Sequence, residues 1–204
     1  MKVYTNIFSK IVSKDNLCAA WKEFRKDKKN RRDVIEFAQD LDANISKLNK
    51  DLILRRYRHG QYRAFFIHDP KQRKIHKATV RDRILHHAVF NVLNPIFEPT
   101  FIADSFSCRV GKGTHKAVDR LEKMCRRNSR NSTQNCFALK CDIRKFFGTV
   151  DHNKLLEIIE RRVEDKDAMT LIVEIVKSFW SQYLDLFRYR FWINIYFCKF
   201  ILTK

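Results

Sequence analysis

The sequence is short of acidic residues and lacks the patterns of zinc-binding, secreted and membrane-spanning proteins. Its six cysteines include no Cys-x-x-Cys pair, so neither a zinc site nor a disulfide framework is indicated. The N-terminus has no apolar run ahead of a small-residue cleavage site. The longest apolar run near the C-terminus, residues 191–198, is far shorter than the roughly 20 residues that span a bilayer. We therefore expect a cytoplasmic protein with reduced thiols and no membrane partner.

Because acidic residues are few, the chain carries a large net positive charge, which indicates a negatively charged binding partner. Twenty-three Asp and Glu stand against 42 Lys and Arg, a formal net charge of +19 in 204 residues. A folded domain with such an excess usually binds a polyanion, and nucleic acid is the first candidate. The alternative is a solvated basic surface that serves only solubility. An apolar fraction of 45% is sufficient for a core in one sizeable domain or two small ones.

Hydrophobic spacing predicts a helix-rich α+β protein. Apolar residues recur three or four apart up to about residue 56, where Asp15-Asn16 is a candidate helix cap. Residues 62–67 and 73–76 are β-prone and flank a turn, which predicts a hairpin. Helical spacing returns at 80–93, with Pro95 near the exit, and again after Thr114, at 152–162 and at 166–179. The apolar run 136–143 predicts a buried central strand that ends at a carboxylate, and residues 179–200 hold 10 aromatics without a clear period.

Three sequence blocks occur in a fixed order between residues 57 and 180. The first comprises Asp69-Pro70-Lys71-Gln72-Arg73-Lys74-Ile75, Thr79-Val80-Arg81-Asp82-Arg83-Ile84 and Leu93-Asn94-Pro95-Ile96-Phe97-Glu98. The second is Ser105-Phe106-Ser107-Cys108-Arg109-Val110-Gly111-Lys112-Gly113-Thr114-His115. The third is Lys140-Cys141-Asp142-Ile143-Arg144-Lys145-Phe146-Phe147, followed by Val150-Asp151-His152. Together they resemble bacterial reverse transcriptases of the group II intron and diversity-generating retroelement type.

The resemblance implies the fingers and a partial palm of a right-hand polymerase. On that interpretation residues 1–56 form a helical N-terminal region, 57–135 the fingers and 136–178 the start of the palm, with 179–204 an atypical aromatic tail. The implied activity is RNA-directed DNA synthesis, and the implied partners are an RNA template, a DNA primer and dNTPs. Two Mg²⁺ ions would activate the primer hydroxyl and stabilise the departing pyrophosphate.

The resemblance also assigns the metal ligands and the residue beside the sugar. Asp142 matches the carboxylate that ends the first palm strand, and the backbone carbonyl of Ile143 would be a second hard oxygen ligand. Phe147 matches an aromatic side chain that excludes a ribose 2′-hydroxyl by bulk. The alternatives are an exposed turn carboxylate or helix cap for Asp142 and a core residue for Phe147.

Basic residues in the first two blocks match family contacts with nucleotide or template. Lys71, Arg73 and Arg83 match finger residues that contact the triphosphate, and the alternative is an ordinary charged hairpin. Arg109 and Lys112, beside two glycines, are candidates for contact with template or nucleotide, and the alternative is a plain turn.

One element of the family is missing from this sequence. The second metal-binding motif, Tyr-x-Asp-Asp, does not occur, and Tyr183-Leu184-Asp185-Leu186 has one Asp and follows Asp142 too closely. We therefore expect a chain that is truncated before the second Asp box and has no polymerase activity on its own. Two alternatives are a catalytically inert RNA-binding module and a retroelement remnant without function.

Overall fold

The computed structural model describes residues 2–68, 70, 72–141 and 150–181. Four helices come first: α1 (Phe8–Val12), α2 (Lys14–Arg25), α3 (Arg32–Gln39) and α4 (Leu41–Ile53). An antiparallel hairpin follows, β1 (Arg63–His68) and β2 (Gln72–Lys77). The remaining elements are α5 (Val80–Phe97), the 3₁₀ turn η1 (Glu98–Thr100), α6 (Thr114–Asn128), α8 (His152–Glu160) and α9 (Lys166–Ser181). The prediction of a helix-rich α+β protein is confirmed, and none of these helices is long and apolar enough to span a membrane.

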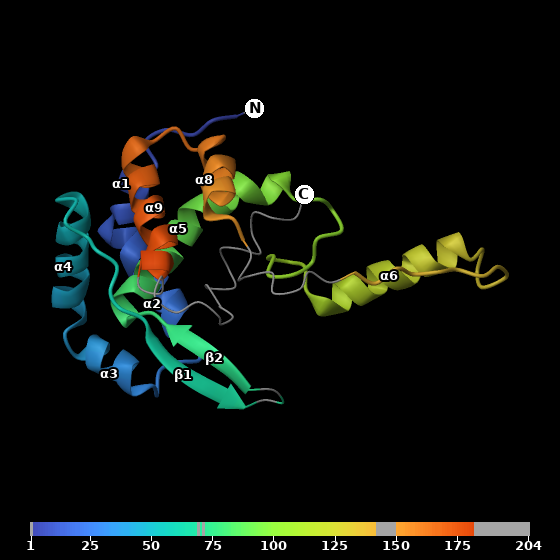
Figure 1. Ribbon diagram of the computed structural model, residues 1–204, viewed down its shortest axis with the longest axis horizontal. Helices are drawn as coiled ribbons and strands as arrows, with labels where there is room; N and C mark the ends of the chain where they lie inside the picture. Colours follow the sequence, from blue (N-terminus) through green and yellow to red (C-terminus); the bar gives the residue numbers. More distant parts are fainter. Residues whose placement is uncertain (1, 69, 71, 142–149, 182–204) are drawn as a thin grey trace.

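Helix α5 is the centre of the hydrophobic core (Figure 1). Four side chains on one face of α5 are at most 1% exposed: Ile84, Leu85, Ala88 and Val89. Thr79 caps it, because the Thr79 hydroxyl accepts a hydrogen bond from the Asp82 amide at 3.2 Å. The helix continues through Pro95 to Phe97, beyond the predicted exit, since a proline in the last turn removes only one backbone hydrogen bond.

Helix α2 packs along α5 with the predicted residues. Leu17, Trp21 and Phe24 are all buried, as the spacing predicted. The predicted cap at Asp15-Asn16 is wrong: Ser13 is the N-cap and accepts from the Asn16 amide at 3.2 Å. The Asn16 side chain instead donates to the carbonyl oxygen of Ala88 at 3.0 Å, which ties α2 to α5.

The segment ahead of α1 is joined to the last two helices of the helical body by hydrogen bonds. Tyr4 exchanges backbone hydrogen bonds with the α8–α9 linker, donating to the Arg162 carbonyl at 2.8 Å and accepting from the Glu164 amide at 2.9 Å. Asp165 accepts from the Phe8 amide at 2.9 Å and from the Ala168 amide at 3.0 Å. One carboxylate therefore caps α9 and holds the start of α1. The core is accordingly one cluster that includes side chains from Ile7 to Val176.

Helix α6 projects from this body and contributes nothing to the core (Figure 1). None of its residues is buried, and Val118 and Leu121 are both more than half exposed. The predicted strand 136–143 is not formed over its described part, residues 136–141, where Phe137 and Leu139 are 92% and 91% exposed. A strand needs a hydrogen-bonded neighbour, and the two strands of the described chain pair with each other.

Replacing Asp165 by alanine should lower the free energy of unfolding by about 2 kcal/mol, because a helix cap and the tie to α1 are lost together. Urea denaturation followed by circular dichroism measures this. Asp40→Ala is a matched control, since Asp40 precedes α4 without a capping side-chain hydrogen bond. Equal losses in the two variants would contradict the assignment.

Candidate nucleic-acid interface

The hairpin predicted from residues 62–67 and 73–76 is present as β1–β2, and it extends away from the helical body (Figure 1). Strand β1 begins and ends one residue later than predicted, and β2 is one residue longer at each end. The pairing runs from Arg63 opposite Lys77 to His68 opposite Gln72. Every residue of β1 is exposed, including Phe65 at 40% and Phe66 at 56%. Exposed aromatic rings among cations are the composition of surfaces that bind nucleic acid strands.

The two faces of the hairpin contact different helices. Because side chains alternate along a strand, one face carries the cross-strand pairs Arg63–Lys77, Phe65–Ile75 and Ile67–Arg73, and we call it the α3 face. Lys77 on this face reaches Asp33 in α3. On the other face His76 packs against Phe179 of α9, with ring centroids 5.6 Å apart. The base of the hairpin is thus held between two helices.

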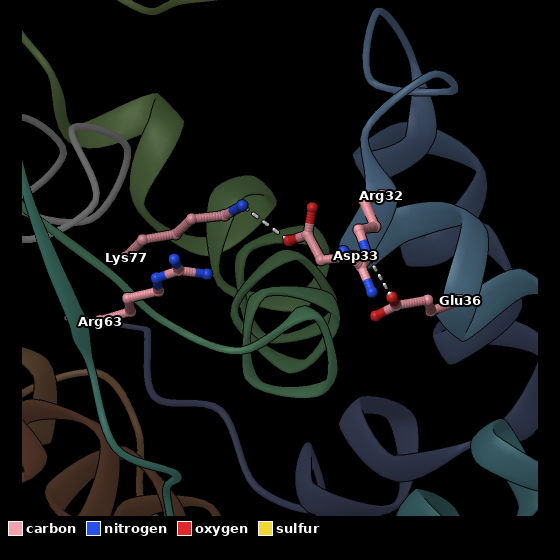
Figure 2. Close-up of a pocket in the computed structure, with 5 residues that line it drawn as sticks. All are labelled: Arg32, Asp33, Glu36, Arg63 and Lys77. Atoms are coloured by element: carbon pink, nitrogen blue, oxygen red, sulfur yellow. Dashed lines mark hydrogen bonds and ion pairs between the residues drawn. The ribbon is translucent and has the colours of Figure 1, made fainter.

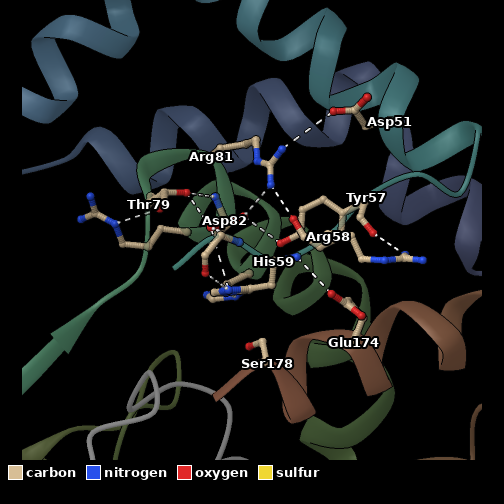
Figure 3. A network of polar contacts seen from close by, with 12 residues as sticks. Asp51, Tyr57, Arg58, His59, Thr79, Arg81, Asp82, Glu174 and Ser178 are labelled. Carbon is tan, nitrogen blue, oxygen red and sulfur yellow. Dashed lines mark hydrogen bonds and ion pairs between the residues drawn. The ribbon is translucent and has the colours of Figure 1, made fainter. Parts of the chain in front are cut away.

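Asp82, in the first turn of α5, holds the chain that leads into the hairpin (Figure 3). Its carboxylate is fully buried and accepts from the Tyr57 hydroxyl at 2.8 Å, the Gly60 amide at 3.1 Å and the Thr79 hydroxyl at 2.5 Å. Burial alone would raise the pKa of Asp82, but the Thr79 bond, the nearby His59 and the Tyr57 bond outweigh it and lower the pKa. Asp82 is therefore ionised and fixes both ends of the hairpin segment.

Glycine is required where the chain passes Asp82. A Cβ at position 60 would lie 2.8 Å from an Asp82 carboxylate oxygen and 2.9 Å from the Thr79 methyl carbon. Next to it, the His59 ring lies 3.2 Å from His86, nitrogen to nitrogen. Burial and the nearby His59 lower the pKa of His86 to about 3, so His86 is neutral near pH 7. The His59 amide also donates to Glu174 of α9 at 3.1 Å (Figure 3).

Asp33 makes a second attachment, between α3 and the base of the hairpin (Figure 2). Its carboxylate contacts Lys77 at 2.7 Å and Arg83 at 2.6 Å. Partial burial opposes ionisation, but the hydrogen bonds to Lys77 and Arg83 are stronger and lower the pKa of Asp33. Arg83, a predicted nucleotide contact, is only 15% exposed and lies over the Phe24 ring. Its side chain joins α5 to α3, and its nucleotide role stays a prediction.

Arg109 and Lys112 hold together the loop between η1 and α6. Arg109 contacts Glu98 at 2.8 Å and donates to the Ser105 carbonyl at 3.0 Å, and Lys112 donates to the Ala103 carbonyl at 2.6 Å. Gly113 ends the loop with a positive φ of 114°. Arg109 lies beside Glu98, which follows Arg83 by 15 residues. At a rise of 1.5 Å per residue, the backbones of Arg83 and Glu98 are about 22 Å apart along the helix. The structure therefore places Arg83 and Arg109 too far apart to grip one phosphate.

The predicted metal ligands and sugar-contact residue lie outside the described residues. Asp142, Ile143 and Phe147 belong to this group, as does Lys71 at the hairpin turn. Among the residues that are described, no group of three His, Cys, Asp or Glu side chains is placed to hold a metal ion. The two-metal site stays a prediction.

Sequence reasoning missed the residues that position the hairpin. Asp82 stands inside the first block, three residues after Thr79, and a Thr-x-x-Asp sequence ahead of an apolar helix is a capping signal. Asp33, Arg63 and Lys77 carried no comparable signal, because their contacts join segments far apart in the chain.

Comparison with known proteins gives a partial similarity. No family model matches the chain. A stretch of 108 residues, 53% of this chain, is 27% identical to Protein YkfC of Escherichia coli (strain K12). That stretch covers 28% of YkfC, so the chain spans little more than a quarter of this relative.

Replacing Asp82 by alanine should lower the free energy of unfolding by about 3 kcal/mol, because the buried Tyr57 hydroxyl and two part-buried donors, the Gly60 amide and the Thr79 hydroxyl, lose their acceptor. Trypsin should also cut the hairpin faster while the helical body stays folded. Since the folded pKa of Asp82 lies below that of the unfolded chain, this stabilisation is present above about pH 4 and is lost as the pH falls through the folded value.

Asp51, whose side chain is 29% exposed and lies 3.8 Å from Arg81, supplies the control. Asp51→Ala should change the unfolding free energy by about 0.5 kcal/mol or less. Hairpin cleavage that is no faster in Asp82→Ala than in Asp51→Ala would show that Asp82 does not anchor the hairpin.

Proposed function

We propose that this chain is the front part of a reverse-transcriptase-type polymerase and that its β1–β2 hairpin contacts the nucleic acid strand. The observation that carries the proposal is the exposed hairpin, which combines Phe65 and Phe66 with Arg63, Arg73 and Lys74. It occupies the part of the chain where the first family block lies. Aromatic rings stack on bases and cations contact phosphates, so such a ribbon is suited to a polynucleotide.

In the complete enzyme the reaction would be template-directed nucleotidyl transfer with two Mg²⁺ ions. Asp142 and the Ile143 carbonyl would be oxygen ligands, and Phe147 would exclude a ribose 2′-hydroxyl. Lys71, Arg73 and Arg83 would neutralise the triphosphate, and Arg109 and Lys112 would contact template or nucleotide. The sequence has no Tyr-x-Asp-Asp motif, so we expect this chain alone to bind nucleic acid without extending a primer.

A second candidate is an inert RNA-binding module. The observation in its favour is that the hairpin is anchored by Asp82 and Asp33, neither of which depends on the predicted metal site. Both candidates share the same binding surface. Primer extension separates them, because only the polymerase interpretation assigns a chemical role to Asp142.

RNA binding should depend on the hairpin cations and fall steeply with salt, because each neutralised phosphate releases counterions. The double variant Arg73→Gln/Lys74→Gln should lower the magnitude of the salt slope by about 1.4 for single-stranded RNA, at about 0.7 per contact. Fluorescence anisotropy over a range of salt concentrations measures this.

The matched control removes two charges from α4, where Lys47 and Lys50 are exposed. Lys47→Gln/Lys50→Gln should leave the slope close to that of the unchanged protein. Equal slopes for the two double variants would mean that charge in general, and not the hairpin, attracts the RNA.

Supplying the missing motif should produce polymerase activity. Residues 1 to about 178 would be joined to the remaining palm and thumb of a reverse transcriptase that carries Tyr-x-Asp-Asp, and primer extension on RNA would be assayed with Mg²⁺. We expect dNTP incorporation that Asp142→Asn abolishes, because the amide lacks the anionic oxygen that a hard cation needs. Phe147→Ala should then admit ribonucleotides. Extension that survives Asp142→Asn would exclude the metal-ligand role.

A further inference from the structure

A hollow of about 430 Å³ separates α3 from the base of the hairpin (Figure 2). Five side chains line it: Arg32, Asp33, Glu36, Arg63 and Lys77. Arg32 and Glu36 come from α3 and pair with each other at 2.8 Å. Arg63 and Lys77 come from opposite strands and project toward α3 in Figure 2. The hollow is therefore polar and opens beside the α3 face of the hairpin.

The charges around this hollow do not balance. Arg32, Arg63, Lys77 and the adjoining Arg83 are four cations, and Asp33 and Glu36 are two carboxylates, so two positive charges remain. Arg63 makes no ion pair with any carboxylate in the described part of the chain. It also stands directly opposite Lys77, and like charges at facing positions destabilise a strand pair. An anion between Arg63 and Lys77 would relieve this repulsion.

We propose that the hollow binds a phosphate group of a single-stranded nucleic acid, with Arg63 and Lys77 as its ligands and the next base stacked on Phe65. The proposal rests on the function proposed above and specifies which strand the hairpin takes. A guanidinium can grip two phosphate oxygens at once, and the ammonium of Lys77 adds a point charge. Phe65 follows Arg63 on the same face, about 7 Å along β1.

The exposed ring of Phe65 selects an unpaired base. Stacking uses the flat face of a base, which is covered by its neighbours in a duplex. A duplex could therefore contact the hollow through its phosphates but could not stack a base on Phe65. Single strands should therefore bind more tightly than duplexes of the same sequence length, and the difference should require Phe65.

Asp33 competes with the incoming phosphate for Lys77. Its carboxylate already contacts Lys77 at 2.7 Å, in the position that an external anion would take. Removing its charge should therefore strengthen phosphate binding, although it weakens the attachment of α3 to the hairpin. A purely structural Asp33 predicts the opposite sign, because a loosened hairpin would bind less well.

The test uses the full chain and a labelled oligouridylate, followed by fluorescence anisotropy. Arg63→Gln should weaken binding about tenfold, the loss of one charge-assisted hydrogen-bonded contact. The control Lys47→Gln, on α4, removes the same charge and should change the affinity by about twofold or less. Asp33→Asn should bind about threefold more tightly. Circular dichroism would establish that each variant is folded, and Arg63 is exposed, so its replacement leaves the core intact.

Further arms identify the source of the phosphate. Phe65→Ala should weaken oligouridylate binding and leave inorganic pyrophosphate binding unchanged, whereas Leu54→Ala, at an exposed apolar residue outside the hairpin, should affect neither. If Arg63→Gln weakens pyrophosphate alone, the hollow takes a free polyphosphate and the single-strand proposal is wrong. Equal affinity for duplex and single strand would also overturn it.

The outcomes separate this inference from the proposed function. If Arg63→Gln behaves like Lys47→Gln while Arg73→Gln/Lys74→Gln still flattens the salt slope, the hairpin binds RNA but the hollow does not. If no polynucleotide binds, the proposed function fails, and the Arg63-dependence of pyrophosphate binding still decides whether the hollow takes phosphate. Weaker binding by a folded Asp33→Asn protein would exclude competition.

Discussion

The buried carboxylate of Asp82 is the contact on which the position of the hairpin depends. It gathers Tyr57, Gly60 and Thr79, which flank the hairpin on both sides, at the start of the most buried helix. A buried charge is stable only when donors surround it, so the three donors and the nearby His59 are required together. Because α5 belongs to the core, the base of the β1–β2 hairpin has a fixed position. The cations and aromatic rings of the hairpin therefore also have defined positions relative to the helical body.

Asp33 acts differently, at the surface. It attaches α3 to Lys77 and Arg83 and so directs one hairpin face toward α3, while His76 and Phe179 place the other face on α9. Arg83, Arg109 and Lys112 all make internal contacts, which position the segments that the resemblance links to nucleotide and template. Arg63 and Arg73 are exposed and lie on the α3 face of the hairpin. The other candidate for a nucleic-acid-binding surface is the basic helix α6, which projects from the body and has no buried side chain.

Much of the fold followed from local spacing, and most of the site did not. Leu17, Trp21, Phe24 and the hairpin were predictable because period 3.6 and period 2 are properties of neighbouring residues. The strand predicted at 136–143 is not formed over residues 136–141, because an apolar run cannot specify whether a partner strand lies beside it. The contacts of Asp33 could not be predicted for a similar reason. Lys77 and Arg83 lie 44 and 50 residues after Asp33, and only the packing of α3 against α5 brings the three side chains together.

The central claim is that the anchored hairpin is where this protein meets a nucleic acid strand. Ultraviolet cross-linking of the full chain to a single-stranded RNA, with the attached peptides identified by mass spectrometry, tests it most directly. We expect cross-links at Phe65 and Phe66 that Asp82→Ala diminishes, because the hairpin then loses its fixed position. Cross-links concentrated on α6, unaffected by Asp82→Ala, would contradict it.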